Sequence, residues 1–170
     1  PDHRKPNPGT PIMFDNPALE RLSKISPMTV LMLYIPVSVW LIWQATNVSS
    51  MPIVASMILG GFLFWTLFEY VFHRTVFHFW PKGKFQSWLQ FVIHGVHHQY
   101  PHDKDRLVMP VTVSATIGWL LFVLFRWVLG DSGFSFAAGF VLGYVFYDMT
   151  HYSIHNFETP KNKLGQLIWR

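Results

Sequence analysis

The sequence predicts an all-α membrane protein with four transmembrane helices and a histidine-rich helical cap on the cytosolic side. Two observations carry this prediction. Only 13% of the 170 residues are charged, 51% are hydrophobic, and residues 25–68 contain no charged side chain, whereas soluble domains average about 25% charged residues. In addition, seven of the nine histidines form three tight clusters beyond the apolar stretches. The length suits one domain, residues 1–170.

Four apolar stretches are candidates for the membrane spans: residues 28–45, 52–72, 110–129 and 134–149. At about 1.5 Å per helical residue they reach about 24–31 Å, close to the ~30 Å hydrocarbon thickness of a bilayer. Pro52 suits the first turn of the second helix. The fourth stretch is short, and we expect its helix to continue through His155.

The connections between these stretches agree with this layout. The uncharged TNVSSM segment and the GDSG segment are short enough to require antiparallel helical hairpins. The long connection 73–109 carries two histidine clusters. Within it, we expect residues 84–98 to form an amphipathic helix lying along the membrane interface.

The cations predict the orientation of the protein. Twelve of the 13 Lys and Arg residues flank the same ends of the predicted helices, and Arg126 alone lies near the other ends. The twelve are Arg4, Lys5, Arg21, Lys24, Arg74, Lys82, Lys84, Lys104, Arg106, Lys161, Lys163 and Arg170. Positive residues favour the cytoplasmic side, so all three histidine clusters are expected there.

The clustered histidines are the candidate metal ligands, because neutral imidazole is the commonest metal ligand among side chains. The chain has no cysteine, which excludes thiolate ligands and leaves nitrogen and oxygen donors. The seven candidates are His73, His78, His94, His97, His98, His151 and His155. We treat His3 as a solitary interfacial residue and do not assign His102 as a ligand.

The histidine spacings favour a dinuclear centre. At ~100° per residue, His151 and His155 share one helix face, whereas His97 and His98 diverge by ~100°. His73 and His78 would lie ~140° apart on an ideal α-helix, so they converge only if the helix ends between them or if they bind different metals. Seven imidazoles also exceed what one ion with open coordination positions requires.

Two carboxylates are placed to support these ligands. Glu69 lies four residues before His73, and Asp148 lies three residues before His151. Each could accept the free N–H of a metal-bound imidazole and so fix its orientation. The alternative is that each simply marks a helix end at the membrane interface.

Four motifs resemble the membrane-bound fatty acid hydroxylase and sterol desaturase superfamily, and within it the fatty acid 2-hydroxylases that act on sphingolipids. They are FDNPALERLSK (14–24), HRTVFH (73–78), HGVHHQYPHDKDRLVMP (94–110) and YDMTHYSIH (147–155). The resemblance implies a cytosolic dimetal centre held by the seven clustered histidines. It also implies oxidation of an unactivated C–H bond by O2 and two reducing equivalents.

The sequence departs from this family pattern in two places. Asn156 stands where relatives often have another histidine, and the family's last HxxHH cluster is expected beyond the KNKLGQLIWR tail, which ends at Arg170. We therefore expect the chain to be truncated at its C-terminus.

The predicted function is hydroxylation at C2 of a fatty acyl chain, carried by ceramide or another sphingolipid. Iron is expected in the active enzyme, because zinc has no redox chemistry, although zinc can occupy the same imidazoles after purification. No HPGG haem-binding motif is present, so a separate electron donor, such as a cytochrome or ferredoxin system, is expected. The predicted location is the bacterial inner membrane or the endoplasmic reticulum. No basic stripe indicates nucleic acid as a partner.

Two other functions are compatible with parts of this pattern. The same superfamily oxidises sterols and carotenoids, and pocket shape would distinguish those substrates. A non-enzymatic membrane carrier of metal or haem is the other alternative. However, bis-histidine haem ligation predicts single histidines within the spans, whereas these histidines lie beyond the helix ends. The HExxH motif of zinc proteases is absent.

Overall fold

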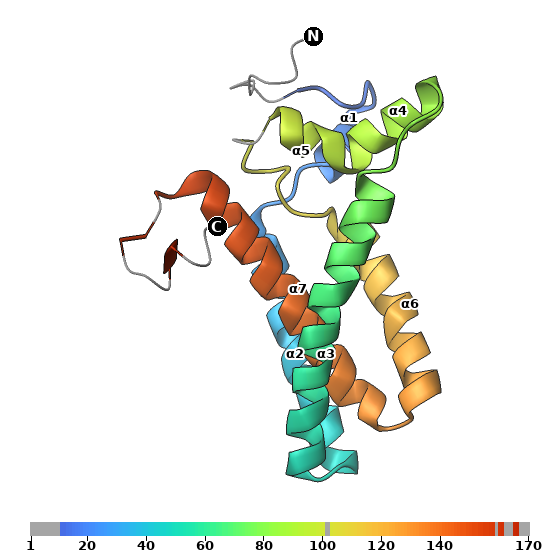
Figure 1. Cartoon of the computed structure of the whole chain (residues 1–170), viewed down its shortest axis with the longest axis vertical. Helices are drawn as coiled ribbons and strands as arrows, with labels where there is room; N and C mark the ends of the chain where they lie inside the picture. Colours follow the sequence, from blue (N-terminus) through green and yellow to red (C-terminus); the bar gives the residue numbers. More distant parts are fainter. Residues whose placement is uncertain (1–10, 101–102, 159, 162–164, 167–170) are drawn as a thin grey trace.

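The structure is a computed structural model, and it describes residues 11–100, 103–158, 160–161 and 165–166, without the side chains of Ile93, His94 and His97. Its described residues form helices and no strands, which confirms the all-α prediction. In chain order the elements are α1 (Pro17–Leu22), α2 (Pro27–Val48), α3 (Met51–Phe72), η1 (His73–Phe77), α4 (Lys84–Gln90), η2 (Phe91–Gly95), α5 (Val96–Gln99), α6 (Val111–Leu129) and α7 (Ser132–Asn156). The two η elements are π-helical turns (Figure 1).

Local sequence signals set the ends of the long helices. Ser26 caps α2 by accepting a hydrogen bond from the backbone N–H of Met28 at 3.3 Å. Pro27 and Pro52 occupy the first turns of α2 and α3, where a missing N–H costs no helical hydrogen bond. Gly130, with a φ of 57°, ends α6, and such a left-handed conformation favours glycine.

Helix α7 is the centre of the bundle, with α2, α3 and α6 packed around it (Figure 1). The crossing of α3 and α7 depends on small residues. A Cβ added to Gly139 would meet the carbonyl oxygen of Ile58, and one added to Gly143 would lie 2.6 Å from the Cβ of Trp65. Close backbone approach through glycine is a common way for membrane helices to associate.

Aromatic side chains fill the space beside this crossing. Trp65 lies edge-to-face with Phe140 at a centroid distance of 4.9 Å, and Phe125 lies edge-to-face with Phe136 at 4.9 Å. Such pairs add about 0.5–1.5 kcal/mol beyond the burial of their area. Phe64 of α3 also lies 6.1 Å from Phe125 and 5.6 Å from Phe136 between ring centroids, so a phenylalanine of α3 contributes to the packing between helices.

Three of the helices are long and apolar enough to cross a membrane: Pro27–Val48, Met51–Phe77 and Val111–Leu129. They correspond to the first three predicted spans, and α2 and α3 extend beyond the predicted ends. In α6 only 6% of the most apolar 18-residue stretch is buried, so its apolar side chains face outward. An outward-facing apolar surface of this kind indicates a membrane protein.

Helix α7 is not among these three, although its helix continues through His155 as predicted. Its buried face carries Gly133, Ser135 and Gly139, and its C-terminal half adds Asp148 and histidines. A helix surrounded by other helices requires small and polar contact residues rather than uniform hydropathy, which explains why it differs from its neighbours.

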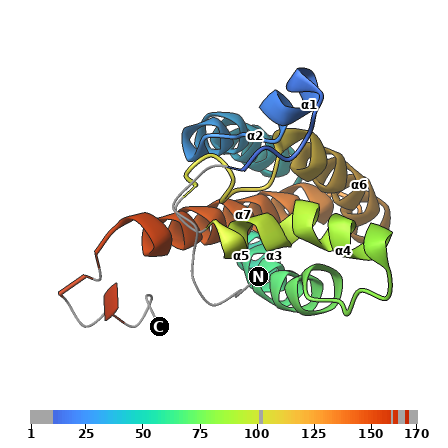
Figure 2. The ribbon, with the colours of Figure 1, turned by 90° about the horizontal axis from the view of Figure 1, so that it is seen from above.

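The remaining helices cover one end of the bundle. Figure 2 looks onto this end, where α4, η2 and α5 form one helical run across the bundle, with α1 nearby. The predicted helix over residues 84–98 is therefore confirmed as a helical run. It differs in one respect, because a π turn at Phe91–Gly95 interrupts its α-helical geometry.

We expect Gly139→Ala to lower the free energy of unfolding in detergent by about 1–3 kcal/mol, because overpacking against a backbone atom cannot be relieved by a rotamer change. Gly118→Ala on α6 is the matched control, since a Cβ there meets nothing within 4 Å. Equal losses of stability in the two variants would contradict the importance of the crossing. Denaturation followed by circular dichroism measures both.

Candidate metal centre

All three histidine clusters lie at the same end of the bundle. His73 and His78 are at the C-terminal end of α3 and η1, the second cluster lies on η2 and α5, and His151 and His155 lie in the last turns of α7. Figure 1 shows the end of α7 and the α4–α5 run at the same end of the molecule. The structure therefore brings the three histidine clusters to one end of the bundle, as the sequence predicts.

A π turn brings His73 and His78 together. The backbone N–H of His78 donates to the carbonyl oxygen of His73 at 3.1 Å, which is the i→i+5 bond of a π-helix. The wider turn carries residue i+5 back over residue i, and the two Nε2 atoms lie 3.0 Å apart. The α-helical angle expected from the spacing therefore does not apply here. Such π turns occur frequently at functional sites.

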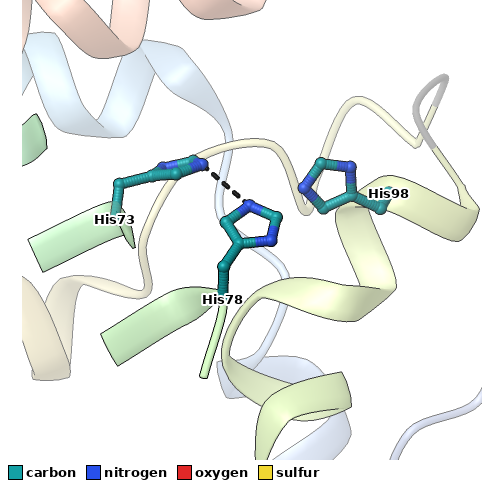
Figure 3. A group of neighbouring side chains, drawn as sticks. All are labelled: His73, His78 and His98. Carbon is teal, nitrogen blue, oxygen red and sulfur yellow. Dashed lines mark hydrogen bonds between the residues drawn. The ribbon is translucent and has the colours of Figure 1, made fainter. Parts of the chain in front are cut away.

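His98 completes a group of three imidazoles with His73 and His78. Their ligand atoms all lie within 4.8 Å of one another, and Figure 3 shows the three rings turned toward a common space from the first residue of η1, the residue after η1 and α5. Burial first, and then neighbouring imidazoles with His78 foremost, lower the pKa of His98 below its ordinary value. A lowered pKa keeps the ring neutral, which is the protonation state that binds a metal.

Glu69 lies behind His73, as its spacing predicts. A Glu69 carboxylate oxygen is 3.4 Å from Nδ1 of His73, while Nε2 of the same ring faces His78. A carboxylate on one ring nitrogen and a ligand position on the other is the arrangement that fixes the tautomer of a metal-binding histidine.

The α7 pair lies beside this group. The rings of His151 and His155 are 4.8 Å apart, and Tyr147 stacks on His151 at 5.7 Å. Electrostatic interactions connect His151 with His73 and His98. The third cluster therefore faces the same region as the first two.

Asp148 is buried in α7 with 7% of its surface exposed. It interacts electrostatically with Tyr144 and Glu69, and its Oδ2 has no hydrogen-bond partner among the described residues. Support of an imidazole by Asp148 stays a prediction. The side chains of His94 and His97, together with residues His3 and His102, lie outside the described part of the structure.

The donor set fits a transition metal. Three converging imidazole nitrogens, one of them supported by a carboxylate, match the preference of iron, zinc and copper for nitrogen ligands. Hard cations such as Mg²⁺ and Ca²⁺ prefer all-oxygen sites. His73, His78 and His98 are therefore the described residues that would hold a metal ion.

An apolar groove of about 600 Å³ leads from the histidines along α3 and α7. His73 and His78 line one part of it, and Phe62, Trp65 and Phe146 line the apolar remainder. Phe146 is 54% exposed, so the groove is accessible from the outer surface of the bundle. The volume is within the range of small-molecule sites.

Sequence reasoning did not identify every residue of this site. Trp65, Thr66 and Gly143 line the groove, yet each reads as an ordinary residue of an apolar helix. Tyr147 also lines it, and its signal was its position one turn before His151 and next to Asp148. The histidine spacing alone does not predict the π turns.

The model of the fatty acid hydroxylase family matches residues 58–168, a range that includes all three histidine clusters. The chain belongs to the fatty acid hydroxylase family. Similar proteins include the fatty acid 2-hydroxylase of Mus musculus (34% identity, covering 84% of this chain and 44% of the relative). The dihydroceramide fatty acyl 2-hydroxylase FAH1 of Arabidopsis thaliana is 34% identical, over 86% of this chain and 62% of its own length.

Two further relatives agree with this family membership. The ceramide very long chain fatty acid hydroxylase scs7 of Schizosaccharomyces pombe is 34% identical over 94% of this chain and 47% of its own length. A solved structure of full-length scs7p, in which only the hydroxylase domain is visible, superposes with a TM-score of 0.82 at 32% identity, over 90% of this chain and 60% of that one. The chain spans about half the length of the curated relatives that it matches.

We expect His78→Ala and His98→Ala to weaken Co²⁺ binding to the purified chain by more than the 10–100-fold typical of losing an outer-shell partner, because each variant removes a ligand. His3→Ala, which changes a histidine far from the clusters in sequence, is the control and should bind Co²⁺ like the wild type. Titration followed by the cobalt absorption bands measures the affinity. Unchanged affinity in both cluster variants would contradict the site.

Proposed function

We propose that this chain hydroxylates C2 of a fatty acyl chain carried by ceramide or a related sphingolipid, using O2 at a dimetal, iron-loaded centre. The observation that carries the proposal is the apolar groove that ends at converging imidazoles. The apolar lining of the groove is complementary to an acyl chain, and the imidazoles are suitable ligands for a redox-active metal. The relatives are fatty acid and ceramide hydroxylases, which favours a fatty acyl substrate over a sterol or carotenoid.

The residues of the groove would hold the acyl chain beside the histidines. Phe62, Trp65 and Phe146 offer apolar contacts to the methylene groups, and the same apolar surface excludes water from the reacting carbon. Glu69 would keep the His73 ring in one tautomer. The role of the protein is to position the C2 hydrogen next to the metal-binding histidines.

Iron with O2 and two reducing equivalents supplies the oxidation of the C–H bond to C–OH, with the second oxygen atom released as water. His73, His78 and His98 would hold one metal. We propose that the remaining clustered histidines, His94, His97, His151 and His155, contribute to the second, with Asp148 supporting them. The electrons would come from a separate donor, such as a cytochrome or ferredoxin system.

We also propose that α7 is the fourth membrane span and that the histidine end faces the cytoplasm. α7 packs between three apolar helices of bilayer length, so it would share their depth while contacting little lipid. The excess of Lys and Arg at the histidine end supports the orientation. A protein in the bacterial inner membrane or in the endoplasmic reticulum can have this topology.

The activity is tested by supplying iron and a reducing system to membranes that contain the chain, with a ceramide bearing a non-hydroxylated acyl chain. We expect a C2-hydroxylated ceramide to form, and to be lost in His98→Ala. Mass spectrometry of the extracted lipids locates the hydroxyl. Hydroxylation elsewhere on the lipid would overturn the positional proposal.

The groove is tested by Thr66→Trp, which adds bulk at the groove wall, with Ser56→Trp as the matched control. Both residues are exposed on α3, and both hydroxyls bond to a carbonyl three residues earlier, at 2.7 Å for Thr66 and 2.9 Å for Ser56. Only Thr66 is among the residues that line the groove.

We expect Thr66→Trp to lower product formation at least ~10-fold while the metal content stays unchanged, since a 1 Å misplacement of substrate can cost ~100-fold. Ser56→Trp should retain activity. Similar activities in the two variants would remove the groove from the proposal.

A further inference from the structure

We propose that Arg106 is a positioning residue that holds the second histidine cluster in place by fastening the loop after α5 to the N-terminal segment. This inference rests on the proposed metal centre. The Arg106 network consists of Arg106, Asp103, Glu20 and Pro11, and it lies outside the residues that line the groove.

The network joins distant parts of the sequence through one guanidinium group. Its Nη2 donates to a carboxylate oxygen of Glu20, and its Nη1 donates to the carbonyl oxygen of Pro11. Its Nε lies 3.9 Å from Oδ2 of Asp103. The planar fork of arginine can address several partners at fixed angles, which the flexible point charge of lysine cannot.

Burial makes the loss of a partner costly. The Arg106 side chain is 2% exposed and that of Asp103 is 3% exposed. A buried charge is retained only when it is paired and hydrogen-bonded, so the loop and the N-terminal segment must stay together for Arg106 to remain buried.

Glu20 is itself held in one orientation. Its second oxygen accepts hydrogen bonds from the backbone N–H groups of Met13 at 2.9 Å and Phe14 at 3.2 Å. Burial opposes ionisation of this carboxyl, but these bonds and the Arg106 charge outweigh it and hold the pKa of Glu20 below its usual range. The carboxylate is therefore the charged partner that Arg106 needs.

A second contact fastens the same two segments. The backbone N–H of Ile25 donates to the carbonyl oxygen of Asp105 at 2.7 Å. On the other side, the Asp103 N–H donates to the carbonyl oxygen of Tyr100, the residue after α5, at 3.0 Å. Only five residues separate Tyr100 from Arg106, so a shift of the loop is transmitted to His98.

The position of α5 depends on such contacts because α5 is the C-terminal part of the helical run formed by α4, η2 and α5. This run lies across the end of the bundle and not among its long helices (Figure 2). His98 on α5 must nevertheless meet His73 and His78, which are carried by a long helix of the bundle and its π turn. The Arg106 network supplies the missing constraint on the α5 side.

The test compares Arg106→Met, Arg106→Lys and Glu20→Gln with Arg126→Met in the whole chain in detergent. Arg126 is the matched control, since it also bridges an aspartate and a carbonyl, with 3.0 Å to Asp131 and 2.5 Å to Gly130. It lies in the last turn of α6, at the end of the bundle opposite the α4–α5 run (Figure 1). Glu20→Gln keeps a hydrogen-bond acceptor, and it serves as the second variant if Arg106→Met does not fold.

We expect Arg106→Met to weaken Co²⁺ binding about 10-fold, the lower end for an outer-shell partner, and to change the cobalt absorption bands. Arg106→Lys should recover part of the affinity, Glu20→Gln should show a smaller loss, and Arg126→Met should show none. A role in stability alone would lower the unfolding temperature and leave the cobalt bands unchanged, and that result would overturn the inference.

Hydrogen exchange of the metal-free chain gives a second measurement. The amides of residues 96–108 should exchange faster in Arg106→Met than in the wild type, while those of α3 stay unchanged. Equal exchange would overturn the inference even if the wild type binds no metal. If the wild type binds Co²⁺ but forms no hydroxylated ceramide, the proposed function fails and the positioning role stands.

Discussion

The close crossing of α3 and α7 is the constraint on which the rest of the structure depends. Gly139 and Gly143 on α7 leave no room for a Cβ against Ile58 and Trp65, so the two backbones approach more closely than ordinary side chains allow. Each of these helices ends in a histidine cluster. Packing within the apolar bundle therefore sets the distance between the clusters at its end.

The second histidine cluster reaches the centre by a different route. It lies on the short run of α4, η2 and α5, which crosses the end of the bundle (Figure 2). Val96 of α5 and Leu107 and Val108 of the loop are buried, and polar contacts between the loop and the N-terminal segment add to this small apolar core. The centre thus combines a rigid half, built on packed helices, with a half that depends on hydrogen bonds and charge.

The groove connects the apolar outer surface of the bundle with the histidine end. Its apolar walls continue the outer surface of α3 and α7, and its inner part is lined by His73, His78 and Glu69. An apolar ligand entering from the side would therefore keep its chain in an environment like the bilayer while one end reached the imidazoles. The same helix crossing that gathers the ligands also forms this path.

The helical class, the apolar spans and the residue types of the centre follow from the sequence, because hydropathy, caps and imidazole content are properties of local segments. The proximity of Glu69 and His73 also follows from the sequence, since a spacing of four residues is fixed by helix geometry. Only the tertiary structure showed that a π turn pairs His73 with His78 and that His98 joins them. It alone joined Glu20 to Arg106. These contacts depend on how distant segments pack, and no local pattern specifies that.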